Sequence, residues 1–264
     1  MKIITLILMT GLFIVGQAYA AAPAITAVQA AASGSTDIVD NAAVSVEINN
    51  SIYTFENNPR LAEALAPVAL QQSWYWPAST LSRLNSSRPE QQRQAVIQQL
   101  EALQGKAGPA LQQQFAALQS QISSWQLAER ILIPIDYDLA RAKAPFNPRF
   151  EPGSYKLQLV ARPEQVQFWG AVLRPIAVAH SGATAIAAYL PAVEHSAFAD
   201  KSVVYLIQPN GSIAEVGVAG WNQQHTEAMP GAEVFIPFAT GWFSKDINKL
   251  NQDLLALALH RVAQ

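Results

Sequence analysis

Alternating hydrophobic and polar positions mark the first folded segment of the chain. Residues 44–48 place Val, Val and Ile on one side and Ser and Glu on the other, which is the two-residue period of a strand with one buried face. Asn49 and Asn50 supply turn residues, and residues 52–55 predict a returning strand. A helix is then predicted from Pro59, because asparagine caps a helix well and proline is tolerated in its first turn.

A helical period of hydrophobic positions replaces the strand pattern over residues 87–126. Ser87 and Glu90 have the spacing of a capping box, and Gly105 ends the first predicted helix. The apolar stripes of the two helices are formed by Val96, Leu100 and Leu103, and by Leu111, Phe115, Leu118, Ile122 and Trp125. We therefore expect an α-helical hairpin in this region.

Strand patterns return after the hairpin, at Ile131–Ile135 and at Tyr155–Ala161. Residues 44–162 thus give the order β, β, α, (αα), β, β, with the helical hairpin inserted between the helix and the third strand. The pattern favours a first domain that ends near Arg162 and Pro163. A single mixed α+β domain for the whole chain is the alternative.

The last third of the chain contains a further set of short elements. A strand at 166–172 and a helix at 181–193 are followed by strands at 203–207, 213–218 and 233–238. The sequence Pro209-Asn210-Gly211 predicts a hairpin between two of these strands, because Asn-Gly supplies positive φ angles. Pro230-Gly231 precedes the last strand, which we expect at the edge of the sheet. The order suits a small sheet crossed by one helix.

These residues, in this order, resemble the soluble-ligand-binding β-grasp (SLBB) module of polysaccharide export proteins. The matching positions are Gly170-Ala171-Val172, Tyr189-Leu190, Ala199-Asp200, Pro209-Asn210-Gly211, and Pro230-Gly231 before Val234-Phe235-Ile236-Pro237. Trp221-Asn222, His225 and Trp74-Tyr75-Trp76-Pro77 narrow the resemblance to the periplasmic capsule-biosynthesis proteins of the GfcC type. The resemblance implies an α+β fold of two tandem β-grasp domains, residues 44–162 and 163–240, followed by a C-terminal amphipathic helix in residues 241–264.

The first 20 residues have the features of a secretory signal peptide. One early lysine precedes a short apolar stretch, and Ala18-Tyr19-Ala20 is a small-x-small cleavage site. Roughly 13 apolar residues are too few to span a bilayer, which needs about 20. Residues 21–43 are rich in small residues, and we expect a flexible N-terminal segment. No cysteine follows the cleavage site, so we expect a periplasmic protein without a lipid anchor.

Composition excludes several classes of function. The chain has no cysteine, which excludes disulfides, thiol nucleophiles and cysteine metal sites. It has 17 basic and 19 acidic residues and a formal net charge of −2, so no general attraction to nucleic acid is expected. The four histidines occur singly, without the spacing of a zinc site. We expect no metal and no cofactor.

Four residues are candidates for ligand binding. The GfcC resemblance implies that Arg130 lies in a cleft between the two lobes, where a guanidinium with five donors suits sugar hydroxyls, carboxylates or phosphates. Trp76 belongs to the densest aromatic cluster, which serves either as a platform for sugar rings or as a cover for the core. Trp221 and His225 lie in the loop before the last strand and are candidates for the same cleft.

Catalysis has little support in the sequence. No nucleophile elbow, phosphate loop or dinucleotide fingerprint is present. Asp136 and Asp138 are two residues apart in an apparent strand, so both are expected on one face, where such a pair would suit a glycan hydrolase. The preferred function is a non-enzymatic periplasmic accessory protein of capsule or exopolysaccharide biosynthesis. Its expected partners are polysaccharide or polysaccharide-export proteins, and we expect a monomer.

The C-terminal helix has two interpretations. Residues 244–262 carry apolar positions on one broad side, and such a stripe usually docks onto its own domain. Outer-membrane polysaccharide translocons end in amphipathic helices that form a pore, so the resemblance implies a membrane role as the alternative. Asn251 within the stripe disfavours that alternative.

Overall fold

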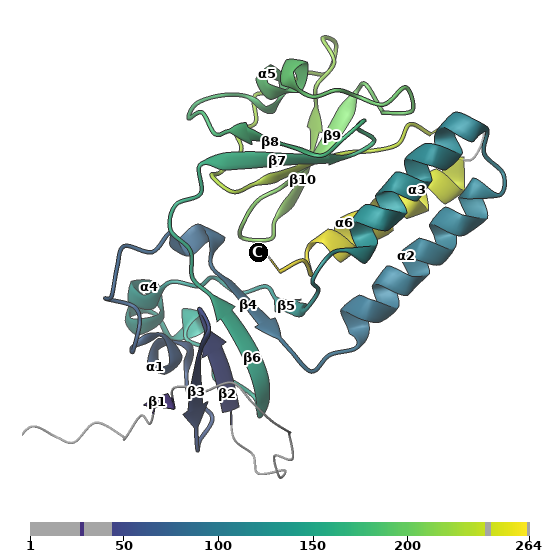
Figure 1. Cartoon of the computed structure of the whole chain (residues 1–264). Coiled ribbons are helices and arrows are strands. Elements are labelled where there is room, and N and C mark those ends of the chain that lie inside the picture. The colour runs from purple at the N-terminus through teal and green to yellow at the C-terminus, as the bar shows by residue number, and fades with distance from the viewer. Residues whose placement is uncertain (1–26, 29–43, 241–243, 263–264) are drawn as a thin grey trace, which may run out of the picture.

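The computed structural model describes residues 27–28, 44–240 and 244–262, which form a mixed α and β protein with two β-sheets (Figure 1). The predicted signal peptide, residues 1–20, and nearly all of the predicted flexible segment, residues 21–43, lie outside the described residues. Within the described ranges, no helix combines the length and the hydrophobicity that a membrane span requires.

The first sheet has six strands in the order β1-β3-β2-β6-β4-β5. Its strands are β1 (Ala27–Val28), β2 (Val44–Ile48), β3 (Ser51–Phe55), β4 (Thr80–Arg83), β5 (Glu129–Ile131) and β6 (Gly153–Gln158). The central pair, β2 and β6, is parallel, and the other pairs are antiparallel. The short helices α1 (Leu61–Leu65) and α4 (Tyr137–Ala142) contribute Leu61, Leu65 and Ala140 to the core that this sheet forms.

The second sheet has five strands in the order β10-β9-β11-β7-β8. Its strands are β7 (Gln165–Gly170), β8 (Ile176–Ala179), β9 (Val203–Ile207), β10 (Ile213–Gly217) and β11 (Glu233–Ile236). The parallel pair is again formed by the first and last strands, β7 and β11, and lies inside the sheet. Setting β1 aside, both sheets therefore have the same internal strand order.

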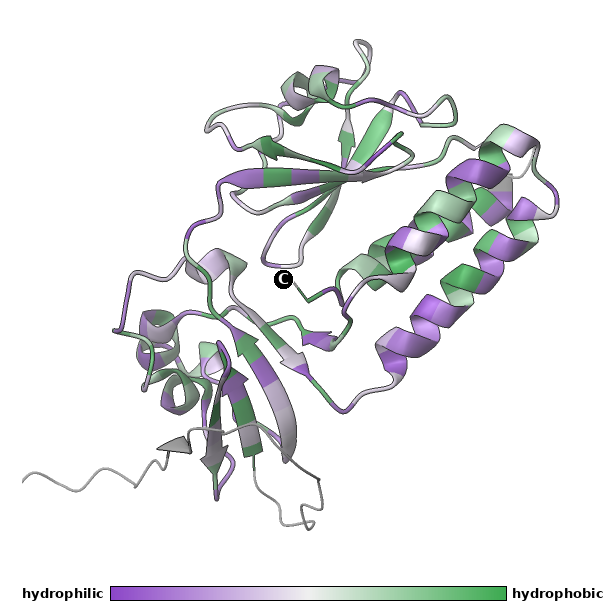
Figure 2. Cartoon of the chain, viewed as in Figure 1, coloured by the Kyte–Doolittle hydropathy of each residue, from purple (hydrophilic) through white to green (hydrophobic). Residues whose placement is uncertain are grey.

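Both faces of the second sheet are covered by other elements. The side chains of β7 show this, since successive side chains of a strand point to opposite faces of its sheet. Phe168 faces the short helix α5 (Ile186–Tyr189), with its ring 6.1 Å from that of Tyr189. Trp169 faces the other way and packs edge-on against Trp125 at 5.3 Å. Figure 2 shows apolar residues along the strands of this sheet and in stripes on the long helices beside it.

Three long helices form the layer on the Trp169 side of the second sheet. They are α2 (Arg88–Gln104), α3 (Pro109–Ser123) and α6 (Ser244–Ala258). Leu100, Phe115 and Leu254, one from each helix, are fully buried in one core with the strands of this sheet. The helical hairpin is thus inserted in the chain of the first sheet but packs on the second (Figure 1). The C-terminal helix docks onto the protein's own core.

The position of the insertion corrects the prediction for the first domain. A strand that the hydrophobic pattern did not reveal, β4, precedes the hairpin, so the hairpin is inserted between the third and fourth strands of that domain. Only Leu81 of this strand is a large apolar residue, and Ser82 is buried beside it. Buried serine removes the alternation by which such a strand is recognised.

Two predictions for the second sheet were also wrong in detail, and one of its strands was missed. The last strand, β11, lies inside the sheet and not at its edge, and Val234, Phe235 and Ile236 are all fully buried. A continuous apolar run is typical of a strand covered on both faces. The predicted helix at 181–193 is reduced to α5 and a 3₁₀ turn at Leu190–Ala192, and β8 was missed.

Candidate functional site

A cleft of about 830 Å³ lies between the two sheets, and we refer to it as the inter-sheet cleft. Its walls come from strands β4 and β6 of the first sheet, from β7, β9 and β11 of the second, from the end of α3 and from the chain after α6. The linker at Pro163 and Glu164 joins the two sheets at the same place. The volume is in the range of small-molecule sites.

Arg130 lies in this cleft, as the resemblance implied. It is the middle residue of β5, and its side chain leaves the strand on the side opposite to Ile131, which packs on the first core. One guanidinium nitrogen, Nη2, donates a hydrogen bond to the Pro209 carbonyl at the tip of the β9–β10 hairpin. Arg130 thus reaches from the first sheet to the second and lines the cleft between them.

The hairpin tip is shaped for this contact. Gly211 has φ +89°, and a Cβ atom there would lie 2.5 Å from Leu132 Cδ2 and 3.6 Å from Arg130 Cζ. Both the positive φ and the space favour glycine. The Asn-Gly turn predicted from the sequence therefore also fits the second sheet against β5.

A partly buried carboxylate lines the same cleft as Arg130. Glu233 at the start of β11 accepts a hydrogen bond from Arg261 Nη1 at 3.2 Å, and the two side chains are only 20% and 24% exposed. Burial raises the pKa of Glu233, against the opposing effects of Arg261, Trp169 and Arg130. Burial likewise lowers the pKa of Arg130, against the opposing charge of Glu233.

Two tryptophans form the inner wall of the cleft. The Arg261 guanidinium lies over the Trp125 ring at 5.3 Å, and Trp125 packs on Trp169. Trp169 is 1% exposed, and its indole N–H lies close enough to the Glu233 carboxylate to help lower the pKa of that group. This wall therefore presents a buried donor next to the Glu233 carboxylate.

The remaining polar lining of the cleft is rich in amides. Six glutamines line it: Gln121, Gln126, Gln158, Gln165, Gln167 and Gln208. A glutamine amide both donates and accepts hydrogen bonds without carrying charge, which matches the hydroxyl groups of a sugar. Thr80 and Ser124 add hydroxyl groups to the same lining.

The chain after α6 connects the two walls. The backbone N–H groups of Ala128 and Arg130 donate to the carbonyl and to Nδ1 of His260, at 2.9 and 3.1 Å. The backbone N–H of Val262 donates to the Gln126 carbonyl at 2.9 Å. Because Arg261 in the same segment pairs with Glu233, this segment joins β5 to β11.

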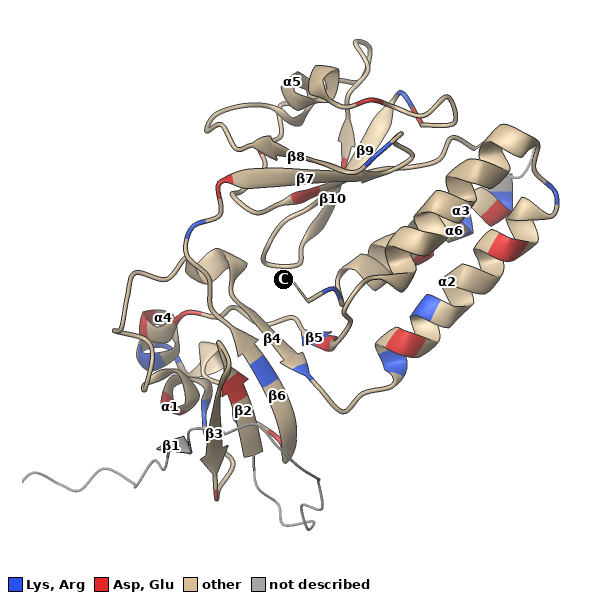
Figure 3. Ribbon diagram, in the orientation of Figure 1, with Lys and Arg blue, Asp and Glu red and all other residues tan. Residues whose placement is uncertain are grey.

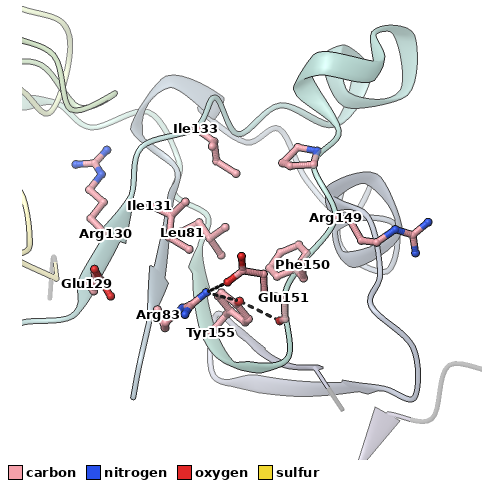
Figure 4. A pocket seen from close by; sticks show the side chains of 11 residues that line it. Leu81, Arg83, Glu129, Arg130, Ile131, Ile133, Arg149, Phe150, Glu151 and Tyr155 are labelled. Atoms are coloured by element: carbon pink, nitrogen blue, oxygen red, sulfur yellow. Dashed lines mark hydrogen bonds and ion pairs between the residues drawn. The ribbon is translucent and has the colours of Figure 1, made fainter. Parts of the chain in front are cut away.

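A second cavity, of about 500 Å³, lies on the other side of β5 (Figure 4). Leu81, Ile131 and Phe150 form much of its apolar lining, while Arg130 points away from it. At its rim Arg83 forms an ion pair with Glu151 at 2.5 Å. Charged residues of both signs are interspersed over the whole fold (Figure 3).

The other three predicted site residues do not line either of these two cavities. Trp76 is in a 3₁₀ turn, Trp76–Ala78, and packs partly buried against the first core, as a cover would. Trp221 is 80% exposed. It follows β10 near Ser202, at the opposite end of the β9–β10 hairpin from Pro209, because the Asn222 amide donates to the Ser202 carbonyl. His225 is exposed and lies 3.2 Å from Glu227.

The predicted acidic pair is not in a strand, which corrects the geometry assumed for a hydrolase. Asp136 is the N-cap of α4, and its carboxylate accepts a hydrogen bond from the Leu139 N–H at 2.8 Å. Asp138 lies in the first turn of that helix. Neither lines the two cavities, and within the described residues no three His, Asp or Glu side chains gather as a metal site would require.

Comparison with known proteins gives the family. The sequence profile described as "Capsule biosynthesis GfcC, N-terminal" matches residues 40–162, and the profile described as "Capsule biosynthesis GfcC C-terminal" matches residues 174–263. The chain belongs to the GfcC capsule biosynthesis family. Its relatives include "Uncharacterized protein YjbG" of Escherichia coli (strain K12), which is 26% identical over 234 residues, covering 88% of this chain and 95% of that protein.

In this member of the GfcC family, the sequence revealed Arg130 but not its neighbours in the cleft. Glu233 and Arg261 stand in apolar elements more than a hundred residues away from Arg130, and no local motif connects them. The single signal was that each is a charged residue beside a strongly apolar segment, where an unpaired charge is costly.

Proposed function

We propose that this GfcC-family chain is a non-enzymatic accessory protein of capsule or exopolysaccharide biosynthesis that binds glycan in the inter-sheet cleft. The observation that carries the proposal is the cleft itself, which combines about 830 Å³ with Arg130 and six glutamine side chains. Sugar sites need donors and acceptors in fixed directions, and amides and a guanidinium supply them.

We infer that each sheet is a β-grasp domain. The support is the shared strand order, in which a hairpin is followed by a helix, then by two further strands and by a last strand that pairs in parallel with the first. In this interpretation the first domain carries the helical hairpin as an insertion, and the cleft lies between the two domains.

We also propose that the protein acts in the periplasm after removal of residues 1–20. The support is the signal-peptide pattern and the absence of cysteine. Within this proposal the protein is a monomer, and its partners are polysaccharide or polysaccharide-export proteins. A membrane role for α6 is disfavoured, because Leu250, Leu254 and Leu257 are fully buried in the protein's own core.

Isothermal titration with fragments of the capsule of the producing strain tests the proposal. Arg130→Ala should weaken binding at least about tenfold, since it removes a charged donor that lines the cleft. Arg174→Ala is the matched control, because Arg174 belongs to the second sheet's region but its side chain is 76% exposed and outside the cleft. Undiminished affinity in folded Arg130→Ala would contradict the proposal.

A further inference from the structure

The partly buried charged groups of the inter-sheet cleft do not balance. Four charged residues line it, Arg130, Arg261, Glu164 and Glu233, and Glu164 is exposed to solvent. Among the three that are partly buried, one positive charge is in excess. Glu233 is already paired with Arg261 at 3.2 Å. Among the described residues, Arg130 makes no ion pair within 4.0 Å. The one hydrogen bond that its side chain makes to them is donated to the Pro209 carbonyl.

A partly buried guanidinium without a carboxylate in direct contact is unfavourable, because it loses hydration and gains only the more distant charge of Glu233. Arginine has five N–H donors, and the contact with Pro209 uses one nitrogen. The remaining donors border a cleft that is large enough for a ligand.

We propose that the inter-sheet cleft selects glycans that carry an acidic group, such as a uronic acid, and that Arg130 binds this group while Glu233 limits the site to one negative charge. The inference rests on the proposed glycan-binding function and adds the substrate class. Arginine suits this role, because its planar donors match the two oxygens of a carboxylate. Glutamines of the lining such as Gln126 and Gln167 would contact the uncharged hydroxyl groups of the same ligand, whereas the Gln208 amide already donates to the Glu227 carbonyl and accepts from the Met229 N–H.

Glu233 has a defined part in this site. Its carboxylate faces the same cavity as Arg130, so it repels a second anion there and neutralises Arg261 through their ion pair. Replacing Glu233 by Gln keeps its size and removes its charge. The partly buried part of the Glu233→Gln site would hold two cations and no anion, with only the exposed Glu164 left at the cleft, and its preference for acidic ligands should increase.

The experiment compares two probes of identical length by isothermal titration. One is an oligosaccharide with glucuronate units, and the other is the same oligosaccharide after reduction of its carboxyl groups to alcohols. The full secreted chain should bind the acidic probe at least about tenfold more tightly than the reduced one. Arg130→Gln should abolish this preference, Glu233→Gln should enlarge it several-fold, and Arg174→Gln, an exposed arginine, should leave it unchanged.

The outcomes separate the two levels of the proposal. Equal affinities of the two probes would overturn acid selection and leave glycan binding intact. Failure of both probes to bind would overturn the proposed function and the inference with it. If Arg130→Gln fails to fold, the wild-type protein still tests the inference, since rising salt should reduce affinity for the acidic probe and not for the reduced one. A preference that salt does not reduce would contradict a charge-based site.

Discussion

Asn251 shows how a single polar side chain holds an element in place. It is 6% exposed within the apolar face of α6, where its amide accepts from the Phe238 N–H at 3.1 Å and donates to the Phe238 carbonyl at 2.9 Å. These two hydrogen bonds give partners to the backbone N–H and carbonyl of Phe238, which follows β11. The residue that had disfavoured a membrane role is therefore a structural contact between α6 and the second sheet.

Asn251→Ala should lower the free energy of unfolding by about 2–4 kcal/mol, because it leaves two buried backbone groups without partners. Gln252→Ala, one residue further along the same helix and exposed, is the control and should change it by less than about 0.5 kcal/mol. Urea denaturation measures both. Equal, small effects for the two variants would show that the Phe238 contacts do not stabilise the fold.

His260 links stability to pH. Burial lowers its pKa from the usual 6.5, with Arg88 and Arg130 acting in the same direction and Glu129 in the opposite one. The unfolded chain therefore binds the proton more readily, so this contribution to stability is lost as the pH falls below about 6.5. In the fold, moreover, protonated Nδ1 cannot accept from the Arg130 N–H.

The difference in unfolding free energy between wild type and His260→Gln should thus shrink as the pH is lowered from about 7.5 to about 5. The comparison cancels the opposite contribution of Glu233, whose raised pKa adds stability as the pH falls. Urea titrations at several pH values measure the difference. A difference that is constant with pH would rule out His260 as the titrating group.

At the scale of elements, the long helices were easier to predict from the sequence than the short strands. The helices α2, α3 and α6 have 17, 15 and 15 residues and carry apolar stripes of helical period, and all three were predicted. The strands β4 and β8 have four residues each and no clean alternation, and both were missed. Which core the hairpin joins was not predictable either, because a stripe shows that a face is buried and not what it is buried against.

Leu100→Ala tests the packing of the inserted hairpin. Leu100 is fully buried in α2, in the core of the second sheet, so its truncation should cost about 2–5 kcal/mol. Hydrogen exchange followed by mass spectrometry should show faster exchange in β7 and β11, and little change in β2. Gln98→Ala, exposed on the same helix, is the control. Faster exchange confined to the first sheet would contradict the observed packing.

At the scale of the whole molecule, the two cores do not follow the two halves of the sequence. The first core holds β2, β6 and α1, and the second holds the other sheet together with α2, α3 and α6. The N-terminal family match, residues 40–162, therefore supplies two of the helices that complete the C-terminal half. Arg130, Glu233 and Arg261 line one cleft only because of this arrangement, which explains why pattern and spacing revealed just one of them.

Nuclear magnetic resonance of the tryptophan indole N–H groups would test most directly whether ligand binds between the sheets. The chain has six tryptophans, and Trp125 and Trp169 line the inter-sheet cleft whereas Trp76 and Trp221 do not. Titration with an acidic capsule oligosaccharide should shift the resonances of Trp125 and Trp169 and leave those of Trp76 and Trp221 in place. Shifts of Trp76 or Trp221 alone would contradict the account and locate glycan binding outside the cleft.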